Sequence, residues 1–136
     1  MRAHILDANA LYRFLTKTAG ADVVADLFKR ALREGQPLLM SVINWGEVFY
    51  TLARNLGFER ARRIMAEAEI LPLTIVDADK SQVEAAAGLK AGYALAYADC
   101  FAAALAGKDG VVVTADPEFK ARIKTLRILA LPRHRQ

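Results

Sequence analysis

The sequence is short of cysteine and of long hydrophobic runs, and each shortage excludes a class of protein. One cysteine in 136 residues can form neither an intrachain disulfide nor a thiolate metal cluster. No apolar stretch reaches the roughly 18 residues of a membrane span, and Asp7 comes too early for a secretory leader. We therefore expect a cytoplasmic protein, a single domain over residues 1–136, with no membrane partner.

Histidine is also scarce, which narrows the ligands available to a metal. Of the two histidines, His4 lies in a predicted buried strand and His134 in a basic tail. Carboxylate oxygens remain, and they suit hard cations such as Mg²⁺ or Mn²⁺. The net charge of +4 is compatible with a polyanionic partner, although many ordinary domains are mildly basic. The positions of the acids are therefore more informative than the net charge.

Short apolar runs alternate with helical periodicity along the chain. Strands are predicted over 3–6, 37–40, 71–76, 111–113 and 127–131, and helices over 9–17, 22–33, 43–56, 59–69, 79–91 and 95–106. Pro72 cannot donate a hydrogen bond to a neighbouring strand, so it favours a sheet edge. Strands that alternate with helices are typical of a mostly parallel sheet. The predicted class is α/β.

Two acids come just after predicted strands. Asp7 directly follows the first strand, and Asp116 follows the strand that ends near Thr114. Ligands of open α/β sheets gather at the carboxyl ends of the strands, so both acids are candidates for a binding site. Apolar neighbours would desolvate the Asp7 carboxylate, which is costly unless the group is paired or binds a metal. The alternative is that Asp7 only caps the following helix.

Two further acids lie in apolar helices. Glu47 is surrounded by large side chains such as Trp45 and Phe49, so it reaches solvent only if it faces a cleft or shares a polar helix face with Arg54. Asp99 is followed by alanines that allow close helix packing, although the helix dipole alone also favours an acid in a first turn. If all four acids converge, they repel one another unless cations neutralise them.

The order of these motifs resembles one known family. The chain has Ile-Leu-Asp-Ala-Asn at 5–9, Glu47 in the third predicted helix, Tyr-Ala-Asp at 97–99 and Val-Thr-Ala-Asp-Pro-Glu-Phe at 113–119. Across essentially the whole chain this order resembles the PIN-domain family, and the length is similar to that of its VapC-type toxin ribonucleases. The resemblance implies five strands in the order 3-2-1-4-5, flanked by helices, with strands 1 and 4 adjacent.

The same resemblance implies a function. The catalytic, metal-binding acids would be Asp7, Glu47, Asp99 and Asp116, with Asn9 and Thr114 as polar groups that orient them. The implied activity is Mg²⁺- or Mn²⁺-dependent endonucleolytic cleavage of RNA by metal-activated water. The implied partners are an RNA substrate, a second copy in a homodimer, and a VapB-like antitoxin that seats a helix in an apolar groove. Ala8 and Ala115 depart from the polar residues common in the family, which affects the surroundings of the acids rather than the acids.

Basic side chains are candidate contacts for RNA phosphates, although a solvated helix face is their commoner role. The candidates are Arg54, Arg60, Arg62, Arg63, Lys120, Arg122, Lys124 and Arg127. We expect that replacing Arg62 and Arg63 by Ala weakens RNA binding and flattens its salt dependence. Four acids are set aside: Asp77 and Asp79 are interpreted as caps, Asp109 as a turn residue and Glu118 as exposed surface.

Two other functions are weighed against the ribonuclease. A phosphatase of the haloacid-dehalogenase type would use Asp7 as nucleophile, but Asn9 stands in place of its second acid and no cap domain is evident. A PIN-like module that binds RNA or protein without cutting is the non-enzymatic alternative. The presence of all four acids argues against a decayed site. RNA cleavage that is lost with chelator and in Asp7→Asn would favour the enzyme.

Overall fold

A five-stranded parallel sheet forms the centre of the computed structural model, which describes residues 2–133. The strands are β1 (His4–Leu6), β2 (Leu38–Ser41), β3 (Leu73–Val76), β4 (Val111–Thr114) and β5 (Arg127–Ala130). Their order is β3-β2-β1-β4-β5, and every neighbouring pair is parallel. The α/β class and the strand order are confirmed, and the sheet is wholly rather than mostly parallel. His134 lies outside the described residues.

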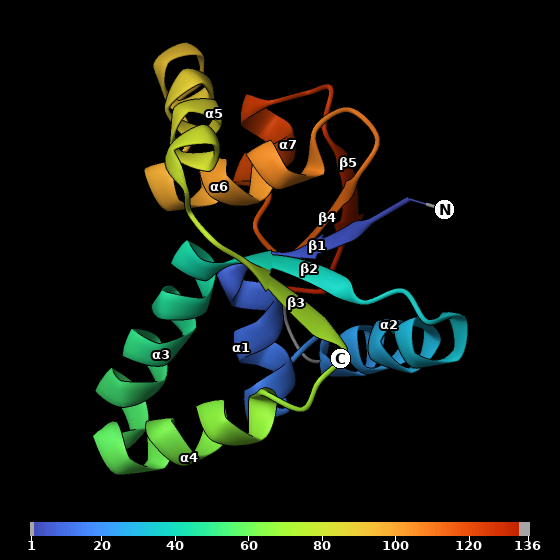
Figure 1. Cartoon of the computed structure of the whole chain (residues 1–136), viewed down its shortest axis with the longest axis vertical. Coiled ribbons are helices and arrows are strands. Elements are labelled where there is room, and N and C mark those ends of the chain that lie inside the picture. Colours follow the sequence, from blue (N-terminus) through green and yellow to red (C-terminus); the bar gives the residue numbers. More distant parts are fainter. Residues whose placement is uncertain (1, 134–136) are drawn as a thin grey trace.

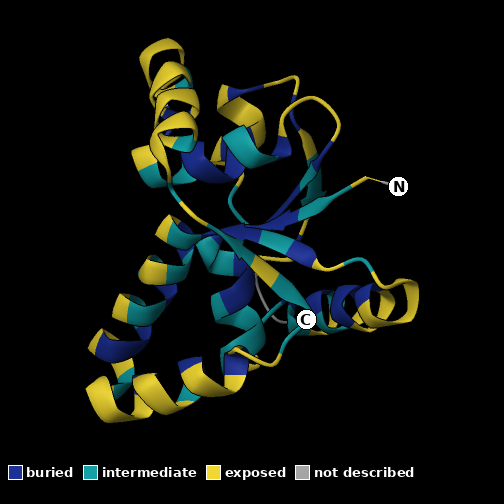
Figure 2. Ribbon diagram, in the orientation of Figure 1, coloured by how far each residue is buried: buried dark blue, intermediate teal, exposed yellow. Residues whose placement is uncertain are grey.

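Helices cover both faces of the sheet (Figure 1). One face carries α1 (Ala8–Thr16), α2 (Ala21–Glu34), α3 (Val42–Leu56) and α4 (Phe58–Ala68), and the other carries α5 (Lys80–Gly92), α6 (Tyr97–Ala106) and α7 (Glu118–Arg122). Successive strand residues point to opposite faces. Leu6 and Val113 accordingly belong to the core beneath α1–α4, whereas Ile5 and Val112 belong to the core beneath α5–α7. Figure 2 shows the buried centre and the exposed outer side of α5.

Several boundaries differ from the predictions. The helix α7 was not predicted, because five residues are too few to show a helical period. The strand β3 begins at Leu73, so Pro72 precedes it, and the Pro72 carbonyl accepts a hydrogen bond from the Leu38 amide at 3.0 Å. β3 is nevertheless the edge strand, as predicted. Among residues 2–133 no helix is long and apolar enough to cross a membrane.

The path of the chain creates a crevice between β1 and β4. From β1 the chain moves outward to β2 and β3, and it then returns to β4 on the other side of β1. The segments that follow β1 and β4 therefore diverge, and such a switch point is where open α/β sheets bind ligands. Leu6 pairs with Val113, and the Asp7 amide donates to the Val113 carbonyl at 3.3 Å. The register thus brings Asp7 beside Thr114.

Candidate active site

A cleft of about 610 Å³ opens at the carboxyl ends of β1 and β4. The four acids singled out in the sequence all line it: Asp7, Glu47, Asp99 and Asp116. They come from the end of β1, from α3, from the first turn of α6 and from the segment after β4. Asn9 also lines the cleft, and Thr114 is buried next to it. Residues spread over most of the chain are therefore gathered in one place.

Asp7 both caps a helix and lines the cleft, so its two interpretations are not exclusive. The side chain is 3% exposed, its Oδ1 accepts a hydrogen bond from the Ala10 amide at 2.7 Å, and its Oδ2 accepts one from the Thr114 hydroxyl. Burial raises the pKa of Asp7 to about 7 although both hydrogen bonds act to lower it, and the charges of Asp99 and Asp116 raise it further. Asp7 is a fixed carboxyl in a crowded, negatively charged environment.

Thr114 links the acids that follow β1 and β4. Its hydroxyl donates to Asp7 and accepts a hydrogen bond from the Asp116 amide at 2.9 Å. The Asp116 Oδ1 in turn accepts a hydrogen bond from the Glu118 amide at 2.9 Å, in the turn that leads into α7. The buried last residue of β4 therefore sets the relative position of two cleft acids.

Asn44 plays a similar part between Glu47 and the start of α6. Its side chain is fully buried, and its Nδ2 donates to the Glu47 Oε1 at 2.8 Å and to the Ala98 carbonyl at 3.1 Å. Burial raises the pKa of the adjacent Asp99 to about 6, and the charges of Glu47 and Asp116 add to the rise. Asn44 was not among the site residues predicted from the sequence. Its spacing of three residues from Glu47, on one helix face, was the available signal.

The predicted RNA-contacting arginines lie outside the cleft lining, whereas two others lie within it. Arg54 stacks over the Tyr50 ring at 4.8 Å, Arg122 pairs with Glu118 at 2.8 Å, and Arg62 and Arg63 are exposed on α4. Arg13 and Arg133 line the cleft, and neither was predicted from the sequence. Of the acids set aside, Asp79 caps α5, Asp109 lies in an exposed turn and Glu118 is exposed. Asp77 is exposed two residues before the cap of α5, so its interpretation as a cap was wrong.

The chemistry of the cleft fits a hard divalent cation. Its donors are carboxylate oxygens, together with the Asn9 Oδ1, which is buried without a hydrogen-bond partner in the described part of the chain. Burial is the chief cause of the raised pKa values of Asp7 and Asp99, and the charges of the neighbouring acids add to it; a bound cation would stabilise both carboxylates. Within residues 2–133, however, no three His, Cys, Asp or Glu side chains lie close enough to hold one ion. The acids share a cleft without meeting at a point.

Comparisons with known proteins agree with this architecture. The PIN domain family model matches residues 4–124, and the chain therefore belongs to the PIN domain family. Among solved structures, DNA-bound VapBC from Salmonella typhimurium is similar at 25% identity and a TM-score of 0.71, covering 96% of this chain and 98% of that one. VapBC2 from Rickettsia felis, bound to a DNA fragment from its promoter, is 17% identical with a TM-score of 0.72 over 95% and 98%.

A third similar structure is described by what it cuts. VapC20 from Mycobacterium tuberculosis, a sarcin–ricin loop cleaving toxin, is 17% identical to this chain with a TM-score of 0.66, over 88% of this chain and 94% of that one. At such identity the likeness shows the fold alone. A search of curated proteins found no match.

Proposed function

We propose that this chain is a Mg²⁺- or Mn²⁺-dependent endoribonuclease and the toxin of a VapBC-type toxin–antitoxin module. One observation carries the proposal: four acids from distant segments line a single cleft at the switch point of the sheet. Membership of the PIN domain family supports nuclease chemistry. The similarity to VapBC complexes and to a toxin that cleaves the sarcin–ricin loop supports RNA as the substrate.

The proposed metal-binding acids are Asp7, Glu47, Asp99 and Asp116. A divalent cation held there would activate water and stabilise the negative charge that develops on the phosphoryl group. Asp7 is held by Thr114 and by the start of α1, and Glu47 and Asp116 each have one carboxylate oxygen held by a hydrogen bond. The second carboxylate oxygens of Glu47 and Asp116 and the half-buried side chain of Asp99 would complete the site.

The protonation of the acids sets a pH dependence. Asp7 and Asp99 bind a cation as carboxylates, and their pKa values are raised to about 7 and about 6, chiefly by burial. We expect metal affinity and RNA cleavage to increase as the pH rises from 5 to 8. Asn9, whose Oδ1 has no other partner in the described residues, supplies a polar group that orients what binds between the acids.

The partner assignments belong to the same proposal. Large apolar side chains are exposed on α3 and at the start of α4, including Tyr50 at 46% and Phe58 at 64%. We assign this surface to the helix of a VapB-like antitoxin, because the similar structures include VapBC complexes. An antitoxin side chain of positive charge, placed among the cleft acids, would silence the enzyme. A homodimer and a cytoplasmic location complete the proposal.

The test is RNA cleavage by purified protein, with metal removed by chelator and then restored. Wild type should cut RNA only with Mg²⁺ or Mn²⁺, and Asp99→Asn and Asp116→Asn should each lose at least about a hundredfold in rate. Asp109→Asn is the matched control, since it removes the same charge from an exposed turn that does not line the cleft.

Four results would contradict the proposal. Cleavage that persists in chelator would contradict the metal dependence, and so would full activity in both cleft variants. RNA binding without any cleavage favours the non-catalytic module. A phosphorylated Asp7 after incubation with a phosphate ester favours the phosphatase. Sequencing the ends of the products cut from total cellular RNA then identifies the target.

A further inference from the structure

Two arginines line the acidic cleft beside the four acids. They are Arg13 on α1 and Arg133, which follows β5. Among the described residues that line the cleft, these two are the only ones with a positive charge. Acids that bind a metal repel the phosphates on either side of the bond to be cut, so a polyanionic substrate needs cations at the rim of such a cleft.

The Arg13 side chain forms hydrogen bonds with the backbone of two neighbouring segments. Its Nη1 donates to the Ala19 carbonyl at 3.0 Å and to the Pro132 carbonyl at 2.8 Å, and its Nη2 donates to the Arg133 carbonyl at 3.2 Å. A guanidinium has five N–H donors in a planar fork, and Arg13 uses them for three hydrogen bonds to main-chain oxygens. Arg13 thus joins the α1–α2 turn to the segment after β5.

That segment is fastened at a second point, next to the acids. The Leu131 amide donates to the Thr114 carbonyl at 2.8 Å, and Thr114 is also the residue whose hydroxyl joins Asp7 to Asp116. The buried Leu131 side chain packs on Gly20, where an added Cβ would lie 3.1 Å from the Leu131 Cβ. Gly20 has φ 87°, a conformation that L side chains rarely adopt. Residues 131–133 are therefore held in place, with Arg133 at the cleft.

The side chain of Arg133 contrasts with that of Arg13. It is exposed, and within residues 2–133 it has neither a hydrogen-bond nor an ion-pair partner. Its donors therefore have no competing partner among the described residues. A guanidinium forms short, charge-assisted and often bidentate hydrogen bonds with phosphate oxygens. We propose that Arg133 binds a phosphate of the RNA at the rim of the cleft, and that Arg13 is a positioning residue that holds Arg133 there; this rests on the proposed function.

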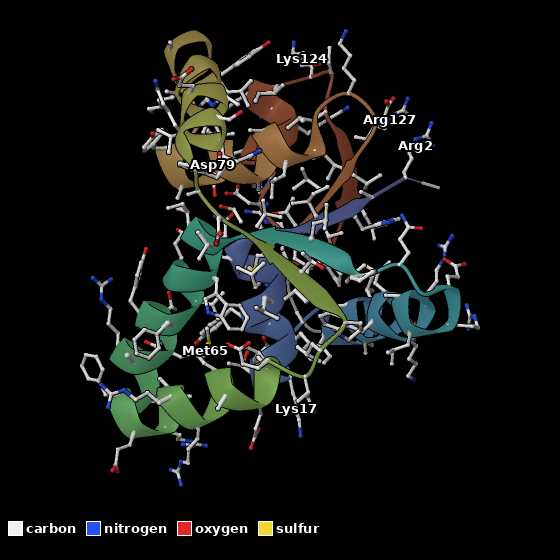
Figure 3. The ribbon with its side chains drawn as sticks, in the orientation of Figure 1. Arg2, Lys17, Met65, Asp79, Lys124 and Arg127 are labelled. Atoms are coloured by element: carbon white, nitrogen blue, oxygen red, sulfur yellow. The ribbon has the colours of Figure 1, made fainter. Side chains whose placement is uncertain are left out.

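The experiment measures binding of a single-stranded RNA oligonucleotide by fluorescence anisotropy, in chelator, over a range of salt concentrations. Arg133→Ala should weaken binding about three- to tenfold and lower the slope of log K against log salt by about 0.7, the value for one lost phosphate contact on a single strand. Arg133→Lys should keep most of the slope. Arg2→Ala removes one exposed charge before β1, at the amino ends of the strands (Figure 3), and should leave both quantities unchanged.

Arg13 is tested by whether it acts through Arg133. Arg13→Lys keeps the charge but loses the planar fork whose two nitrogens span the three carbonyls, so it should weaken binding nearly as much as Arg133→Ala does. In the double variant the two effects should not add, because the second change removes a contact that is already lost. Amide hydrogen exchange at Leu131 should accelerate in Arg13→Lys. In the cleavage assay Arg133→Ala should raise KM and leave kcat nearly unchanged.

The outcomes separate this proposal from the proposed activity. A salt slope for Arg133→Ala equal to that of wild type overturns it, and so do fully additive effects of Arg13→Lys and Arg133→Ala. Absence of RNA binding by wild type overturns it as well. If wild type cuts RNA while Arg133→Ala binds normally, the activity stands and this inference fails. If RNA binding depends on Arg133 but no cleavage occurs, the inference stands and the activity fails.

Discussion

The ends of β1 and β3 carry the same local motif with different results. Asp7 follows β1 with φ −82° and ψ 175°, and its Oδ1 accepts from the Ala10 amide at 2.7 Å. Asp79 comes three residues after the end of β3, with φ −74° and ψ 177°, and its Oδ1 accepts from the Gln82 amide at 2.9 Å. Each caps a helix. Yet Asp7 is 3% exposed, whereas Asp79 stands exposed at the start of α5 (Figure 3).

The difference arises from the neighbouring strands and not from the motif. β1 is central, with β4 beside it, so the Asp7 carboxyl also accepts from Thr114 at the end of β4 and shares the cleft with Asp116. β3 is an edge strand, with no strand on its outer side in the described sheet. A capping aspartate thus becomes part of a candidate active site only where two strands diverge at a switch point. Capping alone indicates a helix start.

The largest expected effect separates the two aspartates by activity. Asp7→Asn and Asp79→Asn both keep a capping side chain, since Asn and Asp cap equally well. Asp7→Asn should lower metal-dependent RNA cleavage at least about a hundredfold, because it removes a carboxylate from the cleft. Asp79→Asn should retain wild-type activity. Equal activity of the two variants in a single-turnover cleavage assay would break the comparison.

The next-largest expected effect of Asp7→Asn is on stability. The substitution that lowers activity should stabilise the folded protein. Burial raises the pKa of Asp7 from 3.8 to about 7, so the folded protein holds this proton more tightly than the unfolded chain does. The stabilisation from the bound proton is full below pH 3.8 and is lost as the pH rises to about 7. Without metal, Asp7→Asn should therefore be more stable than wild type at pH 8, by on the order of 2 kcal/mol.

Urea denaturation in chelator at pH 5 and pH 8 measures this gain. The gain should be smaller at pH 5, because wild type has there lost only part of the stabilisation. Added Mn²⁺ should stabilise wild type more than Asp7→Asn, since a ligand that binds the folded state raises its stability. Asp79→Asn, at the exposed cap, is the control. A gain of the same size in both variants would show that burial at the end of β1 is not its cause.

A third prediction tests the hydrogen bonds that position the acids. Asn44→Ala removes the amide that joins Glu47 to the Ala98 carbonyl, and kcat should fall about 10- to 100-fold, as for other groups that orient metal ligands. Ser41→Ala is the matched control, because it removes a buried cap from the same helix without touching Glu47. Ser41→Ala should cost about 1 kcal/mol of stability and little activity. Similar kcat values in the two variants would assign Asn44 a structural role only.

The residues differ in how far the sequence alone could place them. Asp7 and Asp116 follow apolar runs at strand ends, and parallel strands end at a common edge, so their position could be argued from the residues. Glu47 and Asp99 were joined to them only through the family resemblance. A helical period tells which residues share a face, but not which helix that face will meet.

The residues that were missed have partners without a sequence signature. Asn44 donates to a carbonyl 54 residues away, and Arg13 donates to one 119 residues away. Every residue has a main-chain carbonyl, so no side-chain pattern marks which one will accept. Arg133 could not be predicted for a related reason. Its place at the cleft depends on the contacts that Arg13 and Leu131 make with distant segments. Interactions between side chain and backbone over long separations need the fold.

The smallest expected effect isolates capping itself. Asp79→Ala removes the acceptor for the Gln82 amide, and loss of an exposed cap should cost about 1 kcal/mol of unfolding free energy. RNA cleavage at a temperature well below the melting transition should not change. Restoring a cap with Asp79→Ser should recover most of the loss, since Ser is also a good capping residue. Asp79→Ala could instead lower cleavage, and Asp79→Ser could restore stability without restoring activity. The carboxylate of Asp79 would then contribute to the reaction, and Asp79 could no longer be contrasted with Asp7 as a residue that only caps a helix.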